Sequence, residues 1–234
     1  MERVDHTGAD RLTEERETLL DAILPHVPFD GWTETALRAA VRETGIDREL
    51  ARLAFPRGGI DMALAFHRRA DRRLADLLDR ADLQSMRIRD RIAFCVRKRI
   101  DVVAEHREAV RRGASLFALP QNAPEGMRAL WETADLIWDR CGDTASDYNW
   151  YTKRMILASV ISATMLYWLG DQSTDHASTD AFLERRIDDV MQFEKTKAAF
   201  ERNPLARAMM WGPSRVLGLI RAPGARRDAS YPPS

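Results

Sequence analysis

The sequence predicts an all-α protein with a small N-terminal helix-turn-helix unit and a larger helical body. Nearly every segment has the periodicity of a helix. No run of alternating apolar and polar residues is flanked by hairpin turns, so strands are not expected. The chain has 234 residues, of which 45% are hydrophobic and 31% charged. This composition is ordinary for a globular protein with one sizeable core or two small ones.

The N-terminal unit is expected to contain three helices. The first covers Thr13–Leu24 and ends before a proline. Thr33 caps the second helix, Gly45 ends it, and Asp47 caps the third. Two short helices around a glycine turn form a helix-turn-helix pattern. We therefore assign residues 1–58 to this unit.

The body is expected to extend over residues 59–200. Two prolines in "LPQNAPEG" restrict the residues before them and interrupt the helical pattern. The polar stretch "GDQSTDHAST" marks another turn. The helices between these breaks are predicted at 60–80, 85–106, 107–119, 124–140, 149–169 and 179–200.

The tail, residues 201–234, has a different composition. Its apolar residues include a tryptophan, and the charges after Arg202 are all arginines until Asp228. This pattern favours an amphipathic helix on an anionic membrane surface, and the alternative is a helix packed on its own domain. The candidate membrane-binding residues are Leu205, Met209, Met210, Trp211, Arg215, Val216, Leu219 and Ile220.

The location predicted from the sequence is the bacterial cytoplasm, peripheral on the inner (cytoplasmic) membrane. The acidic N-terminus has neither the apolar stretch of a secretory signal nor the arginines of a transit peptide. Cys95 and Cys141 form no close pair in the sequence, so we expect both to be reduced within helices. Met155–Gly170 carries no charge, but it is shorter than the ~20 residues that span a bilayer. We therefore predict a buried helix there.

DNA binding is the first function that a helix-turn-helix suggests. Arg48, Arg52 and Arg57 lie on or just after its second helix, where they could contact phosphates or guanines. Several acidic residues crowd the same unit, and the whole chain is balanced at 36 basic and 36 acidic residues. Phosphate neutralisation supplies much of DNA affinity, so we favour a helix-turn-helix kept as scaffold.

Enzyme signatures are absent from the sequence. None of the five histidines follows a glutamate by three positions, and no two have the spacing of a helical metal site. The nucleophile elbow, the P-loop and the dinucleotide-binding glycine motif are also missing. The sequence thus predicts a binding protein without catalytic residues, metal or cofactor.

The segment "DYNWYTKRMILASV", Asp147 to Val160, joins aromatic and basic residues to an apolar run. A helix that is apolar all round needs cover from its own domain, a second subunit or a greasy ligand. Exposed aromatics beside arginine are typical of an interface hot spot. The alternative is that Trp150 packs into the core while Arg154 pairs with Asp147 or Asp143.

"CGDTASDYNWYTKR" resembles the signature of a family of coenzyme Q biosynthesis accessory proteins, the ninth member of the eukaryotic coenzyme Q series. The family pattern is Gly-Asp, three residues, Asp, an aromatic residue, Asn-Trp-Tyr-Thr, a basic residue and Arg. "GWTETAL", "LPQNAP" and "FLERRIDD" also look like family landmarks. The resemblance extends over roughly Thr13 to Thr196.

The resemblance implies a dimeric fold like that of the TetR regulators, with a helix-turn-helix that does not bind nucleic acid. It also implies a body that binds an isoprenoid quinone precursor at the membrane and presents it to a membrane-bound quinone hydroxylase. The expected docking surface is centred on Trp150 and Tyr151. Asp147, Asp143 and Arg154 match other motif positions, and Asp135 and Trp138 extend the surface.

The hypothesis is therefore a non-catalytic lipid-binding accessory protein of ubiquinone biosynthesis. Candidate lipid-binding residues lie in the uncharged helix, where they could line either a cavity or a dimer seam: Met155, Ile156, Val160, Met165 and Leu166. The alternatives are a TetR-type DNA-binding repressor with a lipid ligand and an enzyme whose site the motifs do not reveal.

Overall fold

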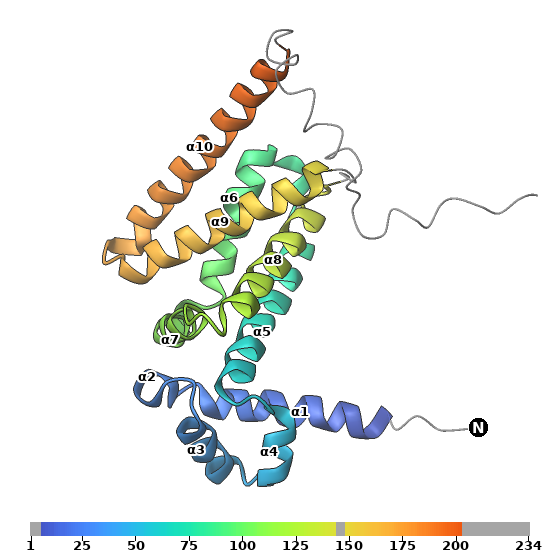
Figure 1. Cartoon of the computed structure of the whole chain (residues 1–234), viewed down its shortest axis with the longest axis vertical. Coiled ribbons are helices and arrows are strands. Elements are labelled where there is room, and N and C mark those ends of the chain that lie inside the picture. Colours follow the sequence, from blue (N-terminus) through green and yellow to red (C-terminus); the bar gives the residue numbers. More distant parts are fainter. Residues whose placement is uncertain (1–5, 144–147, 203–234) are drawn as a thin grey trace, which may run out of the picture. The chain divides into compact units, whose positions relative to one another are not determined.

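The computed structural model describes residues 6–143 and 148–202, with side chains described for 11–143 and 150–192. Asp147 and the predicted membrane-binding residues of the tail lie outside these ranges. No residue within them lies in a strand, which confirms the all-α prediction. The helices, drawn in Figure 1, are α1 (His6–Ile23), α2 (Val27–Asp30), α3 (Glu34–Thr44), α4 (Arg48–Ala54), α5 (Gly59–Asp79), α6 (Ile88–Asp101), α7 (Arg107–Phe117), α8 (Ala123–Arg140), α9 (Tyr148–Gly170) and α10 (Ala177–Arg202).

Two features of the helix order differ from the sequence prediction. The helix expected over 85–106 is shorter, because α6 is flanked by 3₁₀ turns at Leu83–Ser85 and Ala104–His106. Asp82 accepts a hydrogen bond from the Ser85 amide and fixes the first turn. The four-residue helix α2 was not predicted, since it is too short to show a helical period.

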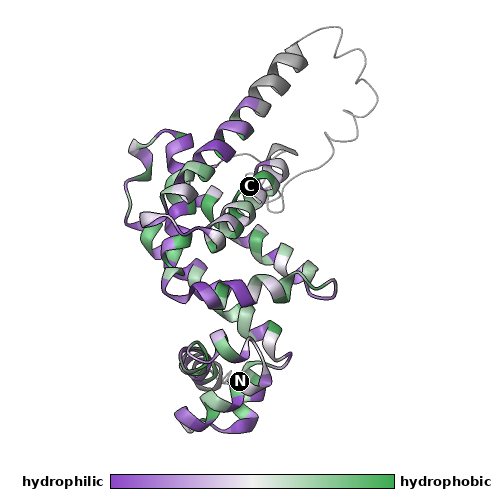
Figure 2. Ribbon diagram, turned by 90° about the vertical axis from the view of Figure 1, so that its left-hand side faces the viewer, coloured by the Kyte–Doolittle hydropathy of each residue, from purple (hydrophilic) through white to green (hydrophobic). Residues whose placement is uncertain are grey.

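The described helices group into two compact units. One contains the chain up to residue 77 together with 98–129, and the other contains 78–97 together with the chain from 130 onward. These boundaries fall inside α5, α6 and α8, not at residue 59. Green and purple segments alternate along helices of the chain in Figure 2, as expected for helices with one buried face. The three-part division made from the sequence stays a prediction.

The helix-turn-helix is fixed by the local signals that the sequence displayed. The Thr33 hydroxyl accepts a hydrogen bond from the Ala36 amide at the start of α3. Gly45 ends α3 in the left-handed conformation, at φ 69° and ψ 8°. The Asp47 carboxylate accepts from two amides in the first turn of α4. Helix α1 packs against both α3 and α4 (Figure 1) and buries Leu19 completely.

Trp32 connects α3 to the rest of its unit. Its indole N–H donates a hydrogen bond of 3.0 Å to the carbonyl of Ala109, and its ring lies 5.6 Å from that of Phe66. The backbone at Gly59 comes so close that a β-carbon there would lie 2.1 Å from the Trp32 carbonyl oxygen. Glycine is therefore required where α5 begins.

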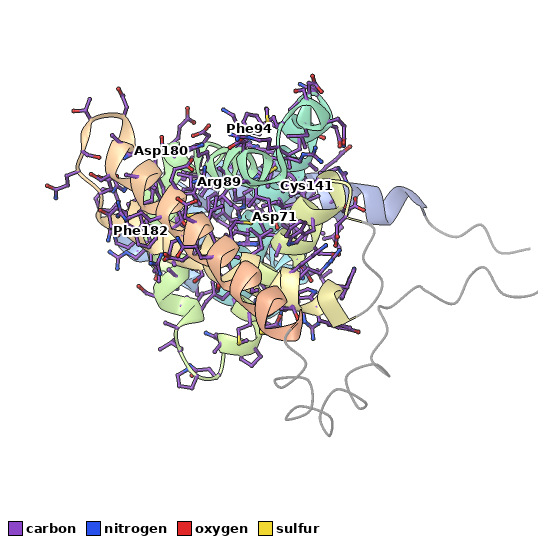
Figure 3. The ribbon with its side chains drawn as sticks, turned by 90° about the horizontal axis from the view of Figure 1, so that it is seen from above. Asp71, Arg89, Phe94, Cys141, Asp180 and Phe182 are labelled. Atoms are coloured by element: carbon purple, nitrogen blue, oxygen red, sulfur yellow. The ribbon has the colours of Figure 1, made fainter. Side chains whose placement is uncertain are left out.

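Ion pairs join α6 to α10 in the second unit. Arg97 contacts Asp180 at 2.7 Å and Glu184 at 2.5 Å. Arg89 contacts Glu184 at 3.0 Å and Asp188 at 2.8 Å. Figure 3 labels Arg89 on α6 and Asp180 on α10. The acidic residues lie one turn apart on α10, so they face α6 as a row.

The connection from α9 to α10 is organised by one carboxylate. Asp171 accepts hydrogen bonds from the amides and hydroxyls of Ser173 and Thr179. These bonds, led by the one from the Thr179 hydroxyl, hold the pKa of the Asp171 carboxyl well below its usual range. Asp171 thereby satisfies amides where α10 begins, and α10 packs back on α9.

Replacing Gly59 with alanine should lower the free energy of unfolding by about 3 kcal/mol, because the new methyl group would collide with backbone. Gly170→Ala is the matched control, since a β-carbon at Gly170 meets no atom within 4 Å. That variant should be unchanged or up to ~1 kcal/mol more stable. Urea denaturation of both variants measures the difference, and equal stability would refute the close contact at Gly59.

Candidate functional site

The site is built on the turn that ends α8. The Asp143 amide donates to the Trp138 carbonyl at 3.0 Å, and the Gly142 amide donates to the Asp139 carbonyl at 3.0 Å. These two bonds, with Gly142 at φ 80°, make a Schellman motif. The motif stops the helix and fixes the position of Asp143. Its carboxylate is consequently placed beside the first turns of α9.

Arg154 of α9 is the central cation of the site. Its side chain is 4% exposed and contacts Asp143, which is 3% exposed, at 3.1 Å. A second contact of 2.5 Å runs to Asp135 of α8. The guanidinium also donates to the Trp150 carbonyl and lies over the Trp150 ring, 3.9 Å from its centroid. A buried charge needs such partners, and this one has two carboxylates and an aromatic face.

Lys153 contacts Trp138, which lies near the end of α8. Its ammonium group contacts Asp143 at 2.6 Å and lies 5.3 Å from the centre of the Trp138 ring. The Trp138 indole donates in return to the Lys153 carbonyl at 3.1 Å. Consecutive basic residues of α9 are therefore tied to the same carboxylate, and α8 and α9 are held together at this end.

Three aromatic rings gather beside this ionic cluster. The Trp150 and Tyr151 rings meet edge to face with centroids 4.8 Å apart. Trp131 of α8 lies 5.8 Å from Trp150 and 6.1 Å from Tyr151. All three side chains are half-buried. We call these rings and the ionic cluster the α8–α9 surface: Trp131, Asp135, Trp138, Asp143, Trp150, Tyr151, Lys153 and Arg154.

The structure combines the two interpretations left open by the sequence. Arg154 pairs with Asp143, as expected by the alternative in which Trp150 packs into the core. Trp150 does not enter the core, however, and stays half-buried beneath the guanidinium. Trp131 was missed by the sequence analysis. Its spacing from Asp135 and Trp138 places the three on one face of α8, and this was the available signal.

Helix α9 keeps one face open in this chain. Met155 is 61% exposed and Leu166 is 59% exposed, and their spacing puts them on the same side of the helix. Val160 is buried, whereas Ile156 and Met165 are intermediate. The chain itself therefore covers the helix only in part, and a second subunit or a ligand stays the predicted cover of the open face. The candidate lipid-binding residues are divided among the core, its border and this open face.

Of the three arginines that could contact DNA, Arg48 is exposed, and the other two pair with acids of their own unit. Arg52 contacts Glu49 at 2.9 Å. Arg57 contacts Asp61 and Glu125, each at 2.7 Å. The hydrogen bond from Arg57 also lowers the pKa of the Glu125 carboxyl. This pairing reduces the positive charge that the helix-turn-helix offers to phosphates.

In the described part of the chain, no group of three or more His, Cys, Asp or Glu side chains is placed to hold a metal ion. Among residues 6–143 and 148–202, no helix combines the length and apolar character needed to cross a membrane.

Replacing Arg154 with methionine should lower the free energy of unfolding by about 3 kcal/mol, because the buried Asp143 loses one of its cationic partners. Arg186→Met is the control, since Arg186 is half-exposed and pairs with Asp189 in the next turn. Its loss should cost less than ~1 kcal/mol. Thermal and urea unfolding compare the two variants. A small effect at Arg154 would contradict a central role for this cation.

Comparison with known proteins places this surface in a family context. The family model named COQ9 matches residues 123–194, which include α8, α9 and the start of α10. The chain is 32% identical over 183 residues to "Ubiquinone biosynthesis protein COQ9, mitochondrial" of Drosophila melanogaster, covering 76% of this chain and 56% of that protein. The Homo sapiens protein of the same name is 28% identical over 202 residues, covering 83% and 62%. The chain thus spans less than two thirds of these curated relatives.

The names of these relatives correct one prediction. The Drosophila, human and Rattus norvegicus proteins are all named as mitochondrial. The predicted location in the bacterial cytoplasm, peripheral on its inner membrane, is therefore wrong. The absence of a secretory signal and the expected reduced cysteines did not identify the compartment.

Among solved structures, the chain resembles the TetR transcriptional regulator from Nitrosomonas europaea ATCC 19718. The TM-score is 0.62 at 18% identity, and the match covers 75% of this chain and 97% of the other. This confirms the predicted TetR-like fold. Together, the comparisons confirm the resemblance seen in the Asn-Trp-Tyr-Thr segment: the chain is similar to the COQ9 ubiquinone biosynthesis proteins.

Proposed function

We propose that this chain is a non-catalytic accessory protein of ubiquinone biosynthesis. It binds an isoprenoid quinone precursor and presents it to a quinone hydroxylase, which docks on the α8–α9 surface. The names of its relatives support the pathway. The observation that carries the docking proposal is the set of half-buried rings around Trp150, which contacts Arg154.

The physics of that surface suits a protein partner. Tryptophan, tyrosine and arginine dominate the residues that supply binding energy at interfaces. Trp150 is already held by the Arg154 guanidinium and by neighbouring rings, so little side-chain freedom remains to be lost on docking. Asp135 is 47% exposed and adds a carboxylate that a basic group of the partner can approach.

The open face of α9 supports a lipid-binding role. Met155 and Leu166 expose apolar surface on a helix without charge between them, and Ser159 on the same face is also exposed. An isoprenoid chain laid on this face would remove that surface from water. A second copy of the chain would also cover this surface, and we include homodimer formation in the proposal.

The tail lies outside the described residues, so its contact with the membrane stays a prediction.

Trp150→Ala should abolish capture of the quinone hydroxylase while the chain stays folded. Loss of the contacts of the Trp150 ring should lower the free energy of unfolding by about 2 kcal/mol, which is small enough for the chain to stay folded. Tyr167→Ala is the matched control, because Tyr167 is an aromatic residue of the same helix and is 38% exposed. That variant should capture the hydroxylase normally. Pull-down with the purified hydroxylase measures both, and undiminished capture by Trp150→Ala would exclude the docking proposal.

Protein purified without detergent from a quinone-producing host should carry isoprenoid quinone or its precursors. Leu166→Glu should lose that lipid, because a carboxylate would face the isoprenoid chain. Leu119→Glu is the control, since Leu119 is also an exposed leucine, with 43% of its surface accessible, and lies in the other unit. Lipid extraction and mass spectrometry give the answer. Finding only bulk phospholipid in the unmodified protein would count against quinone binding.

A further inference from the structure

The fold brings the two cysteines together. Cys95 lies in α6 and Cys141 directly follows α8, and their sulfur atoms are 4.0 Å apart. Both side chains are buried. This pair was not apparent from the sequence, because its members lie 46 positions apart. Figure 3 labels Cys141 and also Phe94, the residue that precedes Cys95 in α6.

The two sulfur atoms have different chemical surroundings. Their mutual hydrogen bond is the largest influence on both, raising the pKa of the Cys95 thiol and lowering that of the Cys141 thiol. Arg91 lies beside Cys141 and donates a 2.5 Å hydrogen bond to its carbonyl oxygen. The Arg91 guanidinium lowers the pKa of both thiols, whereas Asp143 raises that of Cys141. Cys141 lies at the guanidinium and in the turn after α8, so it is assigned as the attacking sulfur, and Cys95 is the thiol that can join it.

Cys141 also has a structural role next to the α8–α9 surface. It is the capping residue of the Schellman motif, followed by Gly142 and then Asp143. Its own amide donates to the Ile137 carbonyl at 2.9 Å. Asp143 holds Lys153 and Arg154. A movement of Cys141 is thus transmitted over two residues to the carboxylate that organises the surface.

We propose that Cys95 and Cys141 form a modification site at which a peroxide produces an intramolecular disulfide. The Cys141 thiolate attacks one peroxide oxygen, and the O–O bond breaks to release water or an alcohol after protonation. Cys141 becomes a sulfenic acid. The Cys95 sulfur then attacks the Cys141 sulfur, the S–O bond breaks, and a second water leaves with the Cys95 proton. The two thiols are oxidised by two electrons and the peroxide is reduced.

The disulfide requires the sulfur atoms to approach from 4.0 Å to about 2.05 Å. Cys141 lies in a turn after its helix, whereas Cys95 is within α6, so most of the movement falls on Cys141. That movement shifts Asp143 and weakens the hold on Arg154. Loss of hydroxylase capture on oxidation rests on the proposed function, whereas formation of the disulfide does not.

The test treats the reduced, full-length protein with hydrogen peroxide, then alkylates the remaining thiols in denaturant and maps the peptides by mass spectrometry. The expected result is loss of both thiols and a linked Cys95–Cys141 peptide from monomeric chains, reversed by dithiothreitol. Persistence of both thiols, sulfinic acid without a cross-link, or linkage between chains would each overturn the proposal. This test uses the protein without substitutions, so its outcome does not depend on whether a variant folds.

A Cys95→Ala variant identifies the attacking sulfur. With no partner to join, the Cys141 sulfenic acid should persist and be trapped by dimedone, while Cys141→Ala should give much less adduct at Cys95. The reverse labelling would contradict the assigned roles. Hydroxylase capture by oxidised and reduced protein is measured in parallel. A disulfide that forms without altering capture would leave the modification site intact and refute its link to the proposed docking surface.

Discussion

The buried pair of Asp143 and Arg154 is the interaction on which the rest of the α8–α9 surface depends. Removing such charges from water costs several kcal/mol for each ion, so each must keep its partners. The Schellman motif supplies the carboxylate at a fixed place, and the first turns of α9 supply the guanidinium. The Trp150 ring then packs against the Arg154 guanidinium, which its ion pairs keep in place. A turn at a helix end thereby determines which aromatic rings remain available at the surface.

Sequence reasoning succeeded where structure depends on neighbouring residues. Thr33, Gly45 and Asp47 act as the caps and stop that their positions predicted. The pairing of Arg154 with Asp143 was one of the alternatives the motif allowed. The contacts of Trp131 and of the Cys95–Cys141 pair were not predictable, because they join distant segments through helix packing. The open face of α9 was also hidden, since an uncharged sequence does not reveal which side its own chain covers.

The fold alone would suggest a different function from the one that the surface supports. A TetR-like fold hosts a helix-turn-helix, yet here Arg52 and Arg57 are paired with acids of their own unit. The COQ9 family model matches residues 123–194, which include α8 and α9. Function follows from the site and not from the architecture. The thiol pair adds a covalent chemistry to the same turn, so that one short segment links helix capping, charge pairing and a reactive cysteine.

The most direct test of the central claim is hydrogen exchange of the full-length chain with and without the purified quinone hydroxylase. We predict that the hydroxylase slows exchange at residues 131–143 and 150–154, which contain the aromatic rings and the ion pairs of Arg154. Exchange in α3 and α4 should not change. Protection confined to the helix-turn-helix, or no protection at the α8–α9 surface despite complex formation, would contradict the claim that this surface docks the partner.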